Sequence, residues 1–256
     1  MQYNRHMRNK ALPCLSLLAT LALPAALAAP LSLVTAHDPP HNMQTDGRVV
    51  GLSTEKVEEM FKRAGVPYTL RFTPWPRAYQ SAHDLPGHCA FSMARTKERE
   101  DQFQWVGPIA QMDWVLYARA EDKLAPRSLE DVRSALIGGS ASDVITQWLV
   151  ANKFRVDPTP TDSLNPAKLV ANRFEYWAVS RQRGVSITAA AGMTGRIVPV
   201  LTFGHSDLYL GCHHDLSGDI VLKLNKALAE MRQDGTYERI NARYTRWAPP
   251  PEAPAQ

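Results

Sequence analysis

The sequence lacks the short motifs that identify the commonest enzyme classes. Its 256 residues contain no G-x-S-x-G, no H-E-x-x-H, no phosphate-binding P-loop and no G-x-G-x-x-G. Serine hydrolases, zinc proteases and nucleotide-binding enzymes therefore have no support in the sequence. There is also no dense stripe of Lys and Arg and no nucleic-acid reader motif. We expect no cofactor and no nucleic-acid partner.

Long apolar runs are absent except at the N-terminus. Residues 1–10 carry three basic residues and no acidic one, residues 11–25 are apolar, and residues 26–28 read Ala-Leu-Ala. This pattern predicts a secretory signal peptide over residues 1–28, cleaved after Ala28. A membrane anchor is the alternative, but the run is short and interrupted by proline. Cys14 precedes most of the run and does not indicate a lipoprotein.

The remaining chain has little net charge and no linker rich in Gly or Ser. The full chain carries +4, and the three basic residues of the signal segment leave about +1 for residues 29–256. These roughly 228 residues suit one bilobed domain or two small ones. No second apolar run is long enough to cross a membrane, so we expect a soluble mature protein.

Cysteine is scarce. The sequence has three cysteines, and only Cys89 and Cys212 lie beyond the predicted signal peptide. An even number in an exported chain suggests a disulfide. Two buried free thiols are the alternative, because distance along the chain proves nothing about pairing.

Strand-like and helix-like segments alternate along the chain, which predicts α/β units with parallel strands. Val57, Met60, Phe61 and Ala64 recur at helical spacing, with Ser53 as the expected cap. The expected strands lie at 31–35, 66–72, 89–93, 114–118, 135–137, 174–179, 197–201 and 208–212. The expected helices lie at 54–64, 77–82, 143–152, 163–171, 180–193, 217–234 and 237–246, with a loop at 138–142.

One aromatic and three arginines suggest a site for a small anionic molecule. Trp75 lies between two prolines at the end of a strand, where α/β clefts open, and its alternative is a structural corner. Arg95 and Arg99 follow the strand at 89–93. An arginine binds a carboxylate through two parallel hydrogen bonds, whereas a surface ion pair is the alternative for Arg99. Arg77 and Arg95 remain open between cleft and surface.

Five segments, at 51–55, 91–99, 103–108, 224–228 and 234–240, occur in an order and spacing that resemble one family. The chain resembles the bacterial periplasmic solute-binding proteins of the polar amino acid type, family 3, which serve ABC transporters. The resemblance implies an α/β fold of the periplasmic binding protein-like type II class, with two α/β lobes joined by two crossing segments. It also implies a periplasmic monomer that binds a small-molecule ligand and an inner-membrane ABC permease, with no chemistry of its own.

The resemblance divides the chain into lobes. Lobe 1 comprises residues 29–111 plus 206–248 and lobe 2 comprises 112–205, with a hinge near 109–113 and 205–209. Residues 249–256 are a Pro-rich tail expected to be disordered. Cys89 and Cys212 fall on neighbouring strands of lobe 1, where a disulfide is sterically feasible.

The resemblance also assigns ligand-binding residues in lobe 1. Trp75 matches the aromatic that covers the ligand, and Arg99 matches the arginine that binds its carboxylate. Ser92 and Ala94 fall where the family commonly has a glycine and a threonine, so Ala94 lacks a ligand-binding hydroxyl.

In lobe 2 the implied contact is the loop Ser140-Ala141-Ser142, whose backbone N–H groups would meet a carboxylate. The acidic anchor for an α-amine falls near Ser180, which is not acidic. Glu175, Asp143 or Asp38 are the candidate substitutes, and the sequence does not choose among them. The site therefore predicts a carboxylate more firmly than an α-amino acid.

A metal site, an enzyme and a ligand-sensing module are the alternatives to this interpretation. His213 and His214 adjoin Cys212, and His88 adjoins Cys89, but adjacent strand residues face opposite ways, so we expect no metal site. An enzyme on the same fold, such as a dehydratase, would need an acid or base at the ligand, for which Glu175 is the candidate. A ligand-sensing module is the third alternative.

Overall fold

The computed structural model describes residues 1, 29–245 and 247. Apart from Met1, the predicted signal peptide lies outside the described residues, as does the predicted Pro-rich tail at 249–256.

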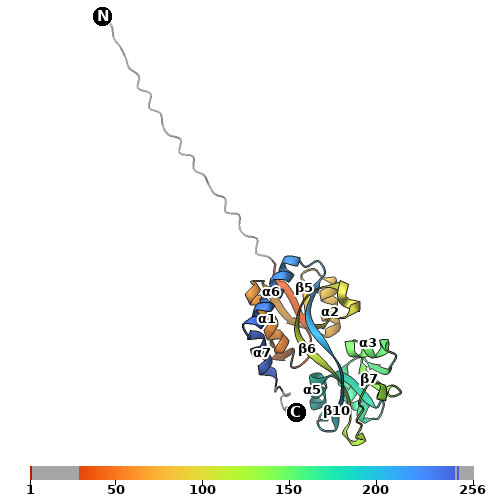
Figure 1. Cartoon of the computed structure of the whole chain (residues 1–256). Helices are drawn as coiled ribbons and strands as arrows, with labels where there is room; N and C mark the ends of the chain where they lie inside the picture. The colour runs from red at the N-terminus through yellow and green to blue at the C-terminus, as the bar shows by residue number, and fades with distance from the viewer. Residues whose placement is uncertain (2–28, 246, 248–256) are drawn as a thin grey trace.

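One eight-stranded mixed sheet runs through the described chain, and helices cover both of its faces (Figure 1). The predicted α/β class is therefore confirmed. In sheet order the strands are β4 (Tyr68–Phe72), β1 (Leu31–Thr35), β5 (His88–Ala94), β10 (Ile197–His213), β6 (Phe103–Arg119), β9 (Tyr176–Ser180), β7 (Leu136–Ser140) and β8 (Arg155–Thr159). A separate hairpin comprises β2 (Met43–Thr45) and β3 (Arg48–Val50).

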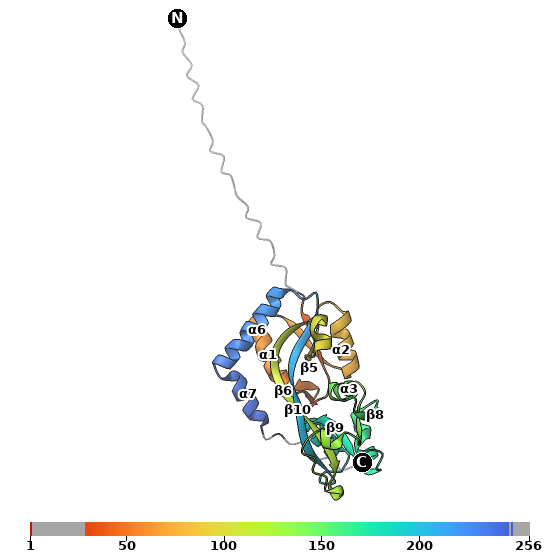
Figure 2. The ribbon, with the colours of Figure 1, turned by 45° about the vertical axis from the view of Figure 1, so that its right-hand side comes forward.

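Strands β6 and β10 are the two connections between the halves of the molecule (Figures 1 and 2). Each is 17 residues long, and they pair antiparallel from Phe103↔His213 to Arg119↔Ile197. The sequence predicted shorter strands at 114–118, 197–201 and 208–212, so the separation of the last two was wrong. The residues between them stay extended because their backbone groups pair across the ladder.

The helices form one layer on each face of the sheet. Their bounds are α1 (Leu52–Ala64), α2 (Trp75–Asp84), α3 (Val144–Ala151), α4 (Asn165–Val170), α5 (Arg181–Ala190), α6 (Gly218–Gln233) and α7 (Thr236–Tyr244). The 3₁₀ segments are η1 (Lys97–Gln102), η2 (Ala120–Asp122), η3 (Glu130–Val132) and η4 (Asp162–Leu164). None of the described helices is both long enough and apolar enough to span a bilayer.

We call the half that contains β1, β4, β5, α1, α2, α6 and α7 lobe 1. Its sheet has one core against α1 and α6, which includes Phe61, Phe91 and Leu224, and another against α2, which includes Ala78 and Met93. Both sides of β5 are buried, which explains its continuous apolar sequence.

We call the half that contains β7, β8, β9 and α3 to α5 lobe 2. Helix α3 buries Ile145 and Leu149 on one face, and Leu169 and Trp177 lie in the core on the other face. Trp177 is fully buried, whereas Trp148 is 37% exposed and packs edge-on against Trp114. The exact lobe boundaries inside β6 and β10 remain a prediction.

Two local predictions were wrong. Helix α1 begins at Leu52, its N-cap is Gly51, and Ser53 lies fully buried inside the helix instead of capping it. The loop expected at 138–142 is strand β7 through Ser140. Gly138 and Gly139 pair with β8 in the strand, and both positions require glycine because a Cβ there would lie 2.2 Å from an atom of Phe174 or Thr146.

Candidate functional site

A cleft of about 650 Å³, partly open to solvent, lies between the two lobes. Lobe 1 contributes residues after β1, at the start of α2 and along β5 and η1, chiefly His37, Asp38, Asn42, Trp75, Phe91, Ser92, Ala94 and Arg99. Lobe 2 contributes the ends of β7 and β9 and the starts of α3 and α5, chiefly Ser140, Ser142, Asp143, Ser180 and Arg183.

Seven of the ten predicted ligand-binding residues line this cleft. They are Trp75, Ser92, Ala94, Arg99, Ser140, Ser142 and Ser180. Arg77, Arg95 and Ala141 do not appear in its lining. Strand ends from both lobes meet here, which is where clefts open in α/β sheets.

Trp75 is held by the backbone at the first residue of α2. Pro74 is the N-cap in an extended conformation, and Pro76 occupies the first turn, where its missing N–H costs nothing. The indole is half-buried and meets the ring of Tyr79 edge-on, with centroids 6.4 Å apart. One apolar indole face is thereby positioned in the cleft.

Arg99 is the cleft cation of lobe 1. One guanidinium nitrogen donates to the carbonyl oxygen of Ala94 at 3.3 Å, and the group lies 5.1 Å from the Tyr79 ring centroid. Burial lowers its pKa, opposed by Tyr79 and Asp143. Within residues 29–245, no carboxylate lies at ion-pair distance from it. The guanidinium therefore keeps donors for a ligand.

Arg95, by contrast, forms an ion pair at the surface. Its Nε donates to Glu100 Oε2 at 2.7 Å, and a second guanidinium nitrogen contacts the other carboxylate oxygen. The side chain packs near the rings of Trp105 and Tyr209. Arg77 is exposed on α2. The alternative of a surface position thus describes both arginines.

Ser92 shapes the cleft through its backbone. It has φ of 60°, and the pairing of β5 with β10 shifts register around it, from Tyr209↔Met93 to Leu210↔Phe91. Such a bulge turns side chains toward a site. The Ser92 hydroxyl accepts from Asn42 Nδ2 at 2.9 Å. Its side chain is therefore already paired with a neighbour in the cleft.

The segment after β7 offers fewer free N–H groups than expected. Ala141 N donates to the Thr159 carbonyl at 2.9 Å, and Asp143 N donates to the Ser140 carbonyl at 3.0 Å. Ser142 is the residue of this segment whose N–H has no such partner among the described residues. The segment therefore does not present several free N–H groups to a ligand carboxylate.

Asp38 and Asp143 bring carboxylates into the cleft, whereas Ser180 brings none. Asp143 caps α3, with Oδ1 accepting from Ile145 N at 2.7 Å. Burial and the neighbouring Asp162 raise the pKa of Asp143 to about 6, although Arg183 opposes this. Glu175, the other candidate substitute, is exposed and accepts from Leu136 N at 2.8 Å instead.

Sequence reasoning missed Arg183. It enters the cleft from the first turn of α5, and its Nε lies 2.9 Å from Oδ2 of the buried Asp162. Asp162 Oδ1 also accepts from Asn165 Nδ2 at 3.2 Å. The only available signal was the basic pair Arg181 and Arg183 directly after a strand. Helical periodicity there is too weak to choose the inward face.

Cys89 and Cys212 form a disulfide at directly paired positions of β5 and β10. Both residues are fully buried in the core between the sheet and α1 and α6. The bond connects the strand that carries Ser92 and Ala94 to one of the two connections between the lobes.

The comparisons with known proteins agree on the fold. The model for bacterial extracellular solute-binding proteins, family 3, matches residues 31–246. No curated protein sequence matches the chain. A histidine kinase sensor domain with similarity to periplasmic binding proteins superposes with a TM-score of 0.75 at 18% identity, covering 86% of this chain and 98% of that one.

Two ligand-bound structures are similar in the same way. An ancestral arginine-binding protein bound to arginine gives a TM-score of 0.71 at 18% identity, covering 86% of this chain and 99% of that one. The GluR0 ligand-binding core from Nostoc punctiforme with (L)-glutamate gives 0.70 at 17% identity, covering 84% and 99%. At these identities the likeness establishes the type II periplasmic binding protein fold.

Proposed function

The chain belongs to the bacterial extracellular solute-binding proteins, family 3, and from this we propose that it is a periplasmic receptor for a small carboxylate-bearing solute such as an amino acid. The solute binds in the cleft between the lobes. The closed protein then delivers it to an inner-membrane ABC permease. We propose that the receptor acts as a monomer and catalyses no reaction.

The observation that carries the proposal is the state of Arg99. Its guanidinium faces the cleft without an ion-pair partner among the described residues, and burial lowers its pKa. A carboxylate would supply two parallel hydrogen bonds and the missing negative charge. Trp75 supplies apolar surface beside it for the rest of a small solute.

Two carboxylates in the cleft favour a ligand that also carries a positively charged group. Arg183 is paired with Asp162, whereas Asp38 and Asp143 remain without an ion-pair partner among the described residues. An ammonium group near Asp143 would compensate the buried carboxylate whose pKa is raised. We propose that Asp143, together with Asp38, replaces the acid that is lacking at Ser180.

Lobe closure is proposed to occur along β6 and β10. These strands alone carry the sheet from lobe 1 into lobe 2, so a small change of twist at 109–113 and 205–209 would bring Ser142 and Asp143 toward Arg99. Closure would exclude water from the charged groups and strengthen their interaction with the ligand.

A ligand-sensing role is the second candidate, favoured by the likeness to a histidine kinase sensor domain at a TM-score of 0.75. Both roles use the same cleft and differ in the partner of the closed form. Crosslinking of the liganded protein in its own cells, followed by identification of the captured membrane protein, separates a permease from a kinase. An enzymatic role has weaker support, because the candidate base Glu175 lies away from the cleft.

The experiment that tests the proposal is a thermal-shift screen of amino acids, amines, carboxylates and sugars, followed by calorimetry on the hits. Arg99→Ala should weaken carboxylate binding by about 10- to 150-fold, since hydrogen bonds to a charged group contribute about 1.5–3 kcal/mol. Arg95→Ala is the matched control and should bind as the parent does. If Arg99→Ala binds every hit as well as the parent does, the proposed site is wrong.

A further inference from the structure

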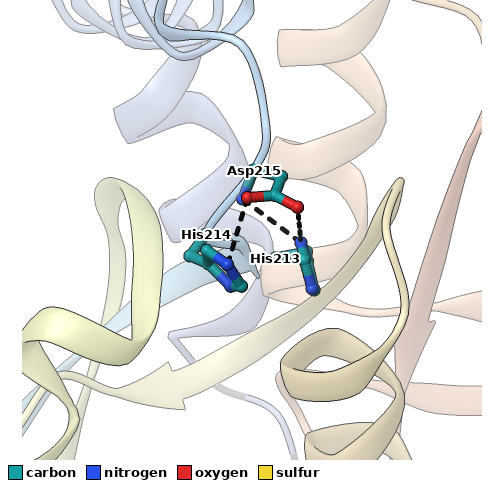
Figure 3. Close-up of side chains that lie close together, drawn as sticks. All are labelled: His213, His214 and Asp215. Carbon is teal, nitrogen blue, oxygen red and sulfur yellow. Dashed lines mark hydrogen bonds and ion pairs between the residues drawn. The ribbon is translucent and has the colours of Figure 1, made fainter.

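A second cluster of ligating side chains lies at the end of β10 (Figure 3). His214 Nε2 is 3.0 Å from Asp215 Oδ1, and His213 Nδ1 is 3.8 Å from Asp215 Oδ2. The two imidazole centroids are 4.2 Å apart. Strand alternation would separate adjacent side chains, but the strand ends at His213 and the next two residues form a turn. Strand alternation therefore does not keep the side chains of His213 and His214 apart.

We propose that His213, His214 and Asp215 form a binding site for a first-row divalent metal ion, with Zn²⁺ as the ion that fits the donors best. One ligand atom from each residue lies within 4.8 Å of the other two. Donors at about 2.1 Å from a tetrahedral ion are about 3.4 Å apart. The two imidazole nitrogens lie 3.8 and 3.0 Å from different oxygens of Asp215, which is close to this spacing, so side-chain rotations would bring one donor atom from each residue around one ion.

The chemistry of the donors selects the class of ion. Two imidazoles and one carboxylate suit Zn²⁺, Ni²⁺ and Cu²⁺ better than Mg²⁺ or Ca²⁺, which prefer oxygen ligands alone. Asp215 N–H donates to His213 Nδ1 at 3.2 Å. This contact implies that Nδ1 carries a lone pair, which is the form that a metal requires, and the ion would replace that hydrogen bond.

The backbone around the cluster is already ordered. His213 is 5% exposed and follows Cys212, which is in the disulfide with Cys89. Leu216 N donates to the His213 carbonyl at 3.0 Å, which closes the turn. Because these bonds exist without an ion, binding would require little further ordering of the chain.

The cluster is also accessible, and it is separate from the cleft. The side chains of His214 and Asp215 are 60% and 64% exposed, so an ion and its water ligand can enter. None of the three residues lines the cleft between the lobes. The proposal is therefore independent of the proposed receptor function.

The test uses protein made without a histidine tag, stripped with EDTA and titrated calorimetrically with ZnCl₂. We expect one Zn²⁺ per chain. His214→Ala and Asp215→Asn should each weaken binding by at least about tenfold. Both side chains are exposed, so neither substitution should affect folding. His205→Ala, which removes another exposed histidine of β10, is the matched control and should bind as the parent does.

Cobalt provides a second readout. Co²⁺ in the stripped protein should give the visible absorption bands of a low-coordinate ion, and His214→Ala should abolish them. The absence of saturable Zn²⁺ binding would overturn the proposal. Equal binding by the parent and by His214→Ala would also overturn it, since the ion would then bind elsewhere.

Discussion

Lys56 donates from Nζ to the carbonyl oxygen of Ile109, at 2.8 Å. Lys56 belongs to α1 and is 1% exposed, whereas Ile109 lies on β6 where the chain begins to leave lobe 1. The ammonium also donates to Asn241 Oδ1 at 2.6 Å and lies 3.5 Å from the centroid of the Tyr237 ring. Tyr237 itself donates to the Ile109 carbonyl at 2.9 Å. Helices α1 and α7 thus contact the same residue of strand β6.

Lys56→Met should reduce the free energy of unfolding by about 1–3 kcal/mol, because it removes both hydrogen bonds of the ammonium and leaves Asn241 Oδ1 without this donor. Urea denaturation measures this. Lys62→Met is the matched control on the same helix. Lys62 is exposed, and its Nζ makes no more than a surface ion pair with Glu59 Oε2, at 3.7 Å. Its loss should therefore change the free energy of unfolding by less than about 0.5 kcal/mol. Equal effects of the two substitutions would contradict the role given to Lys56.

The same lysine predicts a pH dependence. Burial lowers the pKa of Lys56 from its ordinary value of 10.5 to about 7. The unfolded chain therefore binds a proton that the folded protein has lost between these two pH values. This proton difference should make stability rise with pH from about 7 toward 10.5, and its contribution should level off below about 7, where both states are protonated. Lys56→Met should remove this slope in denaturation curves recorded across the same range.

Loss of the Cys89–Cys212 bond should destabilise the protein by about 2–5 kcal/mol, since it crosslinks residues 123 positions apart in the chain. The double variant Cys89→Ala with Cys212→Ala should show this loss in urea denaturation. A reductant should lower the stability of the parent under partly unfolding conditions but leave the double variant unchanged. If reductant leaves the stability of the parent unchanged under all of these conditions, the two thiols are not bonded.

Asp143 should make ligand binding depend on pH, if the ligand carries an amine. Protonation below about pH 6 removes the negative charge that the amine would meet, so affinity should fall as pH drops through this value. A carboxylate without an amine should show the opposite trend, because the repulsion is relieved. Calorimetry at several pH values measures both.

The charged groups around Asp143 are Asp162, Arg183, Asp38 and Arg99. His37 is a second titratable group in the cleft lining, and burial lowers its pKa below the ordinary 6.5. Asp143→Asn distinguishes the two groups: it should flatten the pH dependence. If the variant retains the full dependence of the parent, Asp143 is not the cation-binding group.

Trp75→Ala should weaken ligand binding by about 10- to 30-fold, through loss of the indole face in the cleft. Trp75→Phe should lose less, because an aromatic face remains. Trp148→Phe, which changes an indole outside the cleft, is the control. Intrinsic fluorescence should respond to ligand in the parent and in the Trp148 variant but much less in either Trp75 variant. A response carried by Trp148 would show that the ligand binds elsewhere.

Several features of the site could be predicted from local sequence. Trp75 and Arg99 line the cleft, as expected. Trp75 lies between two prolines and Arg99 lies shortly after an apolar strand, so both adjoin elements with clear periodicity. The disulfide was expected from the cysteine count and from the implied strand order. Arg77 and Arg95 were undecided, since Arg77 lies in the first turn of a short helix and Arg95 lies between two elements, with no periodicity to orient it. Arg95 forms an ion pair with Glu100, which the folded η1 segment brings near.

The sequence by itself determined the order and type of most elements, since apolar periodicity dictates which face of each one leaves water, although the short strands β2, β3 and β8 were not predicted. Only the tertiary structure decided what covers those faces. Asp143 approaches Arg99 and Asp38 because β6 and β10 place the two lobes edge to edge, across more than 40 residues of chain. Lys56 is buried because α7 and β6 pack against its side chain. Such contacts depend on distances between elements, and no local pattern of residues specifies those distances.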